Sequence, residues 1–420
     1  MVVGIIIGAS IFVQPAEINR HVPGLTGVLS VWVVAGILTL AGALVCAELS
    51  SAFPRTGGVY VFLKETLSPT SGFLWGWAMF WSVHSGIIAA TSVILARYVA
   101  YFIPLGDLGI RAVAITGILL LSLVNYLGVR QGSLLQTIVT TAKVVAILVL
   151  LVMVFAFGSA ADRTASDAIA AQASFGEFVL AVSAALFTFG GWHMVTYAAG
   201  ETRNPQKTIP KALLIGSLTV TAIYVALNAA YLYALPLERV ISSTRVAADA
   251  ARALAGTRGA AAISALVILS SLGVLNGVIL AGPRAYFAMA EEGLAFRWLG
   301  SIHPRFRTPH LAILAQALWS SVLVATGTYR DLFTRVIYTE WLFFALMTIG
   351  LFRLRRRAGY VPVYRAWGYP LAPLSFIGAS VVVAVVLIAA DPIQAATGLL
   401  VVVIGWPLCH LWARRKHAHH

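Results

Sequence analysis

The sequence has 420 residues, of which 60% are hydrophobic and only 10% are charged, so a soluble domain is excluded and a membrane protein with many spans is indicated. The net charge of +14 does not indicate nucleic-acid binding, because the basic residues lie in short segments between apolar runs. The two cysteines, Cys46 and Cys409, both lie in apolar runs, so no disulfide framework is expected.

Apolar runs of about 20 residues predict an all-α fold with roughly twelve transmembrane helices. The expected spans are 1–18, 26–50, 72–103, 110–128, 133–157, 176–198, 211–234, 258–285, 310–327, 332–353, 370–390 and 393–413. The first span begins so close to Met1 that its inner half is expected to be short, unless the native start lies upstream.

The first span is interrupted at Gly8-Ala9-Ser10, where a membrane helix should be most regular. A helix broken inside a bilayer leaves N–H and C=O groups without partners, which is tolerated only against protein or a wet cavity. Such a break can offer free N–H groups at Ala9, Ser10 and Ile11 to a substrate carboxylate. An alternative is that Gly4 and Gly8 form a GxxxG packing face.

The sixth span holds a second interruption, because Gly190 and Gly191 are adjacent in the middle of an apolar run. Matching interruptions in two halves of a chain indicate a transporter built from inverted repeats. Five helices per repeat place the halves in opposite orientations. We therefore expect a first repeat over 1–157, a second over 176–353, and two further helices over 370–413.

Positive charge is distributed unevenly between the two sets of loops. Alternate loops hold Arg55, Lys64, Arg203, Lys207, Lys211, Arg284, Arg297, Arg305, Arg307 and the basic stretch from Arg353 to Arg365. The opposite loops are poorer in basic residues and contain Asp107 and Asp391. Because basic loops stay on the inner side of a membrane, both termini are predicted to be cytoplasmic.

Several motifs, in this order and spacing, resemble the amino acid–polyamine–organocation superfamily. They are Gly4-x-Ile6-Ile7-Gly8-x-x-Ile11-Phe12, Ala47-Glu48-Leu49, Pro54-Arg55-x-Gly57-Gly58-x-Tyr60, Gly190-Gly191-Trp192, Gly200-Glu201-x-x-Asn204-Pro205 and Glu340-Trp341. The match is most similar to the branch of L-type amino acid transporters and their bacterial relatives. The resemblance implies a LeuT-type fold of 5+5 inverted repeats, in a bacterial-type inner membrane.

The resemblance also implies where the substrate lies. It assigns the substrate ammonium to carbonyl groups at Ile6, Phe187 and Gly190, and makes Phe187 the aromatic that closes over the substrate. It further suggests Trp341 as a pocket wall and Asn276 as a polar group in helix 8, although interhelical hydrogen bonding is an equal alternative for Asn276. The remaining candidates for the substrate-binding set are Gly8, Ala9, Ser10, Ile11, Ser85 and Gly191.

Four ionisable residues inside spans are candidates for coupling or gating. Lys143 is costly in a bilayer unless it is paired; in relatives that carry it, the ammonium occupies the position of a sodium ion and ties helix 5 to helix 1. His193 and His84 could carry a coupled proton, although a neutral, hydrogen-bonded histidine is the alternative. Glu340 would be protonated or paired, or would bind a cationic substrate.

The predicted function is sodium-independent transport of neutral L-amino acids by alternating access, with exchange as the first mechanism. Alternatives are proton-coupled uptake, transport of cationic amino acids or polyamines, and a sensor that binds without transport. No catalytic motif is present, so an enzyme is not expected. No cofactor, metal ion or nucleic acid is predicted; the expected partners are the amino acid substrate and membrane lipid. The outward loops lack cysteine, so no obligatory ancillary subunit is expected.

Overall fold

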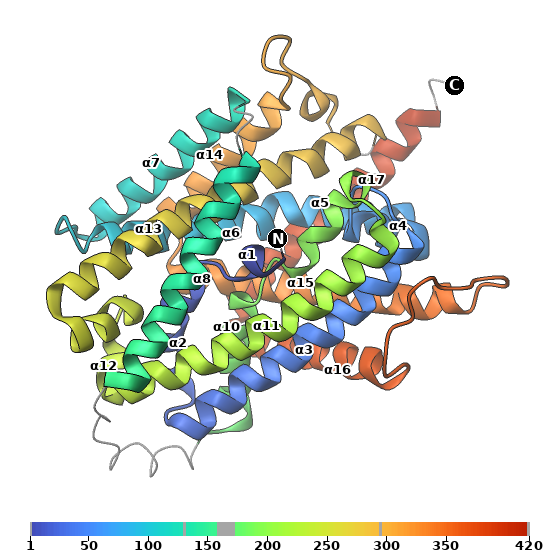
Figure 1. Ribbon diagram of the computed structural model, residues 1–420. Coiled ribbons are helices and arrows are strands. Elements are labelled where there is room, and N and C mark those ends of the chain that lie inside the picture. Colours follow the sequence, from blue (N-terminus) through green and yellow to red (C-terminus); the bar gives the residue numbers. More distant parts are fainter. Residues whose placement is uncertain (1, 129–131, 158–172, 294–295, 418–420) are drawn as a thin grey trace.

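The computed structural model describes residues 2–128, 132–157, 173–293 and 296–417, and this part of the chain contains helices and no strands (Figure 1). The elements of the first half are α1 (Val2–Ile6), η1 (Ser10–Phe12), α2 (Gln14–His21), α3 (Leu25–Ala52), α4 (Val59–Thr66), α5 (Pro69–Ala78), η2 (Met79–Val83), α6 (His84–Val99), α7 (Asp107–Tyr126) and α8 (Gly132–Phe157). The second half holds α10 (Phe175–Thr188), η3 (Trp192–Glu201), α11 (Pro205–Ala234), α12 (Leu237–Ser242), α13 (Val246–Glu291), η4 (Arg297–Gly300), α14 (His310–Thr326), α15 (Tyr329–Arg355), α16 (Leu371–Ala390) and α17 (Pro392–His417).

Eight of the described helices are long and apolar enough to cross a membrane, and three shorter apolar helices lie at 141–156, 310–326 and 398–409. Eleven of the twelve expected spans overlap one of these helices, and the first, 1–18, corresponds to the shorter elements α1, η1 and α2. The largest difference is α13, which begins twelve residues before the expected 258 and contains non-helical angles at Ala255 and Gly256. The segment 59–66, expected as a connection, forms the short helix α4.

Local signals explain several helix starts. Ser68 and Ser71 form a capping box at the start of α5, and Thr328 and Asp331 form another at the start of α15. These side chains satisfy backbone N–H groups that the first helical turn leaves without partners. The third span is continuous from α5 to α6 through a π-helical turn, η2.

The outer helices expose apolar side chains that a soluble protein would bury. On α7, Leu119, Leu120 and Leu123 are each about half exposed, and on α8 the same holds for Val145 and Leu148. Contiguous apolar faces of this kind are suited to lipid. The described helices therefore form a bundle with a lipid-facing exterior.

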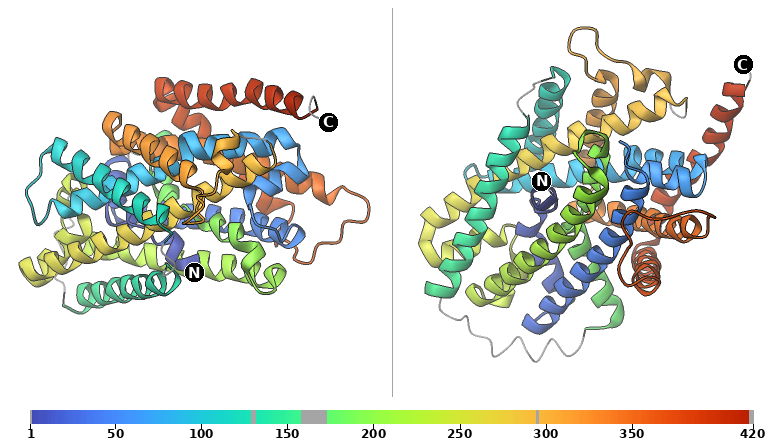
Figure 2. Two further views of the ribbon diagram at one scale, coloured as in Figure 1. Left: turned by 90° about the horizontal axis from the view of Figure 1, so that it is seen from above. Right: turned by 45° about the vertical axis from the view of Figure 1, so that its right-hand side comes forward.

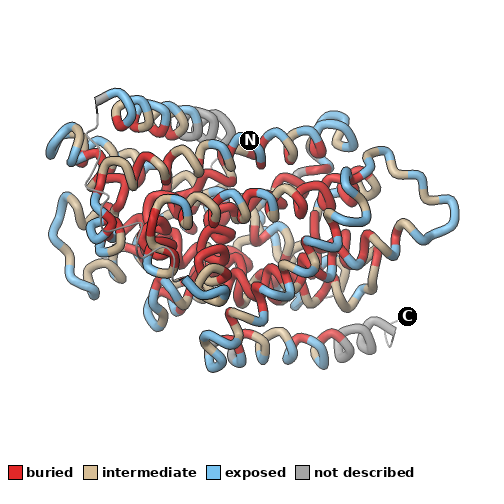
Figure 3. The backbone as a smooth tube through the Cα atoms, turned by 90° about the horizontal axis from the view of Figure 1, so that it is seen from below, coloured by how far each residue is buried: buried red, intermediate tan, exposed pale blue. Residues whose placement is uncertain are grey.

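The two interrupted helices lie inside this bundle. α1 lies near the middle of the structure and contacts α8, α11 and η3 (Figures 1 and 2). α3 and α11 run side by side over much of their length, and α17 lies on the outside against α5. Buried residues concentrate along the middle of the bundle, whereas exposed residues mark the loops and the outer helices (Figure 3).

Candidate functional site

The first helix is interrupted between α1 and η1. The N–H of Gly8 donates to the Ile6 carbonyl at 2.7 Å, which tightens the chain and ends the regular helix. No backbone carbonyl among the described residues accepts the N–H groups of Ala9, Ser10 or Ile11. These three residues are buried, with exposed fractions of 8% or less. Free donors are thus held inside the protein at the start of a helical segment, an arrangement suited to an anion.

The second interruption lies between α10 and η3. The N–H of Gly190 donates to the Phe187 carbonyl at 3.0 Å, and Gly191 has a φ of +89°, which L side chains rarely adopt. A Cβ atom added to Gly191 would lie 3.0 Å from Cγ2 of Ile5. The glycine therefore lets the second interruption pack directly against α1.

Tyr224 of α11 joins the two interruptions. Its hydroxyl lies 2.9 Å from the Ile6 carbonyl oxygen and 3.1 Å from the Thr188 carbonyl oxygen, and its side chain is fully buried. Both carbonyls would otherwise lack a helical partner at the end of a half-helix. Tyr224 was not identified from the sequence. A tyrosine inside a membrane span could have been noticed, because its buried hydroxyl is expected to form a hydrogen bond.

Lys143 reaches the first interruption from α8. Its Nζ donates to the Ile7 carbonyl at 2.5 Å and to the Gly4 carbonyl at 3.3 Å, and the residue is only 2% exposed. The ammonium group therefore donates to one carbonyl within α1 and to another just after its last residue, where a bound cation could otherwise interact with them.

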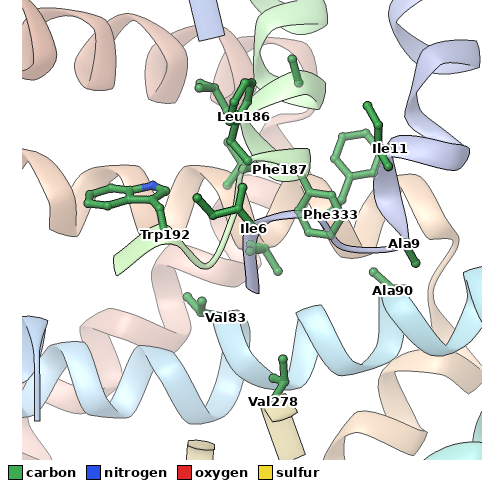
Figure 4. Close-up of a cluster of buried hydrophobic side chains, with 14 of the residues drawn as sticks. Ile6, Ala9, Ile11, Val83, Ala90, Leu186, Phe187, Trp192, Val278 and Phe333 are labelled. Carbon is green, nitrogen blue, oxygen red and sulfur yellow. The ribbon is translucent and has the colours of Figure 1, made fainter. Parts of the chain in front are cut away.

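Buried apolar side chains gather beside the two interruptions (Figure 4). The rings of Phe187 and Phe333 lie 5.6 Å apart, and Ile6, Val83 and Val278 approach the same region from α1, η2 and α13. Phe333 was not identified from the sequence. It lies one turn after Tyr329 on α15, and the centroids of these two rings are 5.6 Å apart. Phe187, Phe333 and Tyr329 therefore form a continuous aromatic layer.

Three sequence-predicted residues have partners on other helices or within their own. The ring of Trp341 packs 5.2 Å from that of Phe376 on α16. The side-chain oxygen of Asn276 accepts a hydrogen bond from Asn125 of α7 at 2.8 Å, and Ser85 donates to the Phe80 carbonyl at 2.6 Å. The structure thus gives these side chains interhelical or local partners rather than a contact with the interruptions.

Residues 1–409 match the sequence family described as amino acid permease. The chain belongs to this family. It is 31% identical to the serine/threonine exchanger SteT of Bacillus subtilis (strain 168), over 99% of this chain and 95% of the relative. It is 27% identical to the human cystine/glutamate transporter, over 98% of this chain and 83% of the relative. Identity to the mouse large neutral amino acids transporter small subunit 2 is 28%, over 99% and 80% of the two chains. These matches confirm the superfamily resemblance and an amino acid transporter of the membrane.

Below the aromatic layer, the permease buries two ionisable side chains against each other. Nε2 of His193 lies 3.7 Å from Oε1 of Glu340, and the exposed fractions of the two side chains are 0% and 2%. Their helical segments are η3, directly after the second interruption, and α15. His84, on α6, is also buried and lies close enough to His193 to act on its charge.

Ion pairs close one end of the permease across three helices. Glu17 of α2 lies 3.2 Å from Arg330 of α15, and His21 contacts Glu177 of α10. α2 follows the first interruption, α10 precedes the second, and α15 carries Phe333. The contacts therefore hold the helices together above the aromatic layer.

The opposite end is joined through Glu48, a fully buried carboxylate near the end of α3. Nε of Arg355 donates to its Oε1 at 2.8 Å, and the Ala366 N–H donates to its Oε2 at 2.7 Å. Sequence analysis quoted Glu48 only as part of a motif. Its partners come from residues more than 300 positions away, which the local sequence does not reveal.

Proposed function

We propose that this permease carries neutral L-amino acids across a bacterial-type inner membrane by sodium-independent exchange, through alternating access. The helices would form a LeuT-type fold of twelve spans, with inverted repeats over 1–157 and 176–353 and two further helices over 370–413. Both termini would be cytoplasmic. The observation that carries the proposal is the pairing of two helix interruptions beside an apolar lining at the centre of an amino acid permease.

An α-amino acid is a zwitterion, so its site needs donors for a carboxylate and acceptors for an ammonium group. The free N–H groups of Ala9, Ser10 and Ile11 would bind the carboxylate. The Gly190 carbonyl accepts no backbone hydrogen bond among the described residues and would bind the ammonium group. The Phe187 carbonyl accepts a bond from the Gly190 N–H and would contribute its second lone pair. The Ile6 carbonyl accepts from both the Gly8 N–H and the Tyr224 hydroxyl, so it would have to release one of these donors to bind the ammonium group.

The lining favours a neutral substrate side chain. Phe187, Phe333, Val83 and Val278 offer apolar contacts and no charge. Glu340 is the carboxylate that could serve a cationic side chain, but it lies against His193 and is 2% exposed. Burying a charged side chain against these walls without a partner would cost several kcal/mol. The transport of cationic amino acids or polyamines is therefore less well supported.

Lys143 supports independence from sodium. Its ammonium group lies 2.5 Å from the Ile7 carbonyl and supplies a positive charge at the first interruption. A sodium ion at the same carbonyls would be repelled by this charge. Exchange is supported by one relative, the serine/threonine exchanger, which matches 99% of this chain. Both cysteines are free and buried, which fits a transporter without a disulfide-linked ancillary subunit.

Competition in proteoliposomes tests the substrate class. Uptake of labelled alanine or leucine would be measured with excess unlabelled neutral amino acids, arginine, lysine or glutamate. Neutral amino acids should compete, and arginine, lysine and glutamate should not. Strong inhibition by arginine that is lost in Glu340→Gln would overturn the neutral assignment and make Glu340 a substrate-binding residue.

A further inference from the structure

His193 and Glu340 form an isolated pair inside the bundle. Aromatic rings surround the imidazole of His193: its ring centroid lies 5.1 Å from that of Phe344, 5.7 Å from Tyr197 and 6.0 Å from Trp75. Among the described residues, neither ring nitrogen of His193 has a hydrogen-bond partner, and neither does Oε1 of Glu340. The imidazole is therefore not the hydrogen-bonded core histidine that would be its ordinary role.

The other titratable groups that face the pair do not supply a balancing charge. His84 approaches from α6, and Tyr197, on η3, lies near Glu340. The thiol of Cys46 on α3 and the phenol of Tyr286 on α13 are within electrostatic range of Tyr197. A tyrosine and a thiol are neutral near physiological pH. His84 is buried and neither of its ring nitrogens has a hydrogen-bond partner among the described residues, so a positive charge on it would itself be costly.

The buried aromatic surroundings disfavour any net charge on the His193–Glu340 pair. A carboxylate beside a neutral imidazole would bury one negative charge, and a carboxylic acid beside an imidazolium would bury one positive charge. Either state is costly at a buried site that is surrounded by aromatic rings. The pair is neutral when it holds one proton, as an ion pair or as two uncharged groups.

The position of the pair links its charge to the transport cycle. His193 lies two residues after Gly191 at the second interruption, and Glu340 lies seven residues, about two helical turns, after Phe333 on the same face of α15. Segments beside the interruptions must move for the substrate to reach either side of the membrane. The two side chains are 0% and 2% exposed in the structure, so a net charge on the pair would be costly for as long as it stays buried.

We infer that His193 and Glu340 together form a proton-binding site that must hold one proton whenever the central site is closed to water on both sides. The inference rests on the proposed function, since it assigns a requirement to the closed state of that transport cycle. The same proton is needed for passage in both directions. Exchange would therefore depend on the pH of the two solutions without needing a pH gradient.

Exchange at equal pH on both sides tests the inference. Counterflow of labelled leucine would be measured from about pH 5.5 to about pH 9, a range in which an imidazole and a buried carboxyl can both titrate. The wild-type rate should fall by about tenfold for each pH unit above its midpoint, as for the loss of a single proton. His310→Asn, which removes a histidine at the start of α14, is the control and should keep the wild-type midpoint.

Two variants of the pair should respond differently. Glu340→Gln removes the group that becomes negative, so its exchange should persist at alkaline pH. His193→Asn leaves a lone buried carboxyl without the imidazole that helps to hold the proton, so its midpoint should move down by about one pH unit or more. Size-exclusion profiles and leucine binding would establish that each variant is folded.

The outcomes separate this inference from the proposed function. Exchange that is independent of pH in the wild type, an unchanged midpoint in Glu340→Gln, or an unchanged midpoint in His193→Asn would each overturn the proton-binding pair while leaving transport intact. The absence of leucine exchange at every pH would overturn the proposed function, and the inference with it.

Discussion

Gly190 and Gly8 lie at the two interruptions but differ in the space around them. A Cβ atom on Gly190 would lie 2.9 Å from the Phe187 carbonyl oxygen, closer than real Cβ atoms approach backbone. A Cβ atom on Gly8 would meet only ordinary contacts, at 3.8 Å from the Ile6 oxygen and 4.0 Å from the Ser10 nitrogen. Gly190 therefore leaves no room for any side chain, whereas Gly8 leaves room for a small one.

This difference predicts distinct effects on substrate binding. Gly190→Ala should weaken leucine binding by about tenfold or more, because the interruption must shift. Gly8→Leu should abolish binding in a folded protein, because its side chain fills the space of the substrate. Gly8→Ala is the matched control and should bind within about threefold of wild type. Scintillation proximity binding after size-exclusion chromatography measures all three, and wild-type binding by Gly8→Leu would favour a packing role for the first interruption.

Lys143 holds the first interruption rather than the substrate. Lys143→Ala removes two hydrogen bonds from a charged donor, each worth about 1.5–3 kcal/mol in other proteins. We therefore expect exchange to slow by about tenfold or more while leucine binding changes by less than about threefold. Paired flux and binding measurements, with the exposed Lys207→Ala as control, test this. Unchanged turnover in Lys143→Ala would contradict the role.

At the residue scale, the sequence predicted backbone sites better than side-chain contacts. The glycines at 8, 190 and 191 mark the interruptions because a helix disfavours them wherever they occur. Trp341 and Phe333 show the limit of this reasoning. Both are aromatic residues of one helix, and eight positions turn them to different faces by about 80°. Only the packing of α15 against α10 and α16 decides that Phe333 meets Phe187 and Trp341 meets Phe376.

At the scale of elements, α11 joins the two interrupted helices through one hydroxyl. Tyr224 donates toward carbonyls at the ends of α1 and α10, which lie 182 positions apart in sequence. α11 also packs along α3 and against α8. The hydroxyl therefore ties both interruptions to a long and well-packed helix.

Removing this hydroxyl should destabilise the protein. Tyr224→Phe leaves the Ile6 and Thr188 carbonyls without this donor, at a cost of about 1–3 kcal/mol. Tyr231→Phe is a matched control two turns along α11, because the Tyr231 hydroxyl has no hydrogen-bond partner among the described residues. Thermal unfolding in detergent should show a lower midpoint for Tyr224→Phe and little change for Tyr231→Phe. Equal midpoints would argue against the bridging role.

Helix existence was predictable from apolar length, whereas some boundaries were not. The expected spans 26–50 and 370–390 differ from α3 and α16 by two residues or fewer. The start of α13 was missed because its first turns are followed by Ala255 and Gly256, where φ at the glycine is +62°. A span predicted from hydropathy begins where the apolar run begins, so it leaves out helical turns that precede a bend before that run.

At the scale of the whole molecule, the contacts at the two ends frame the central site. Glu17 and Arg330 join α2 to α15 at one end, and Glu48 and Arg355 join α3 to the end of α15 at the other. Between them lie the aromatic layer, the interruptions and the His193–Glu340 pair. Transport by alternating access would require one set of end contacts to open while the other stays closed.

Counterflow in proteoliposomes tests the central claim, sodium-independent exchange of neutral amino acids, most directly. Labelled leucine would be added outside liposomes that contain unlabelled leucine or buffer alone, in sodium or choline salts. Internal leucine should stimulate uptake by about tenfold or more, and the rates in the two salts should be equal. Leucine binding without flux, or uptake that requires sodium and ignores internal leucine, would contradict it.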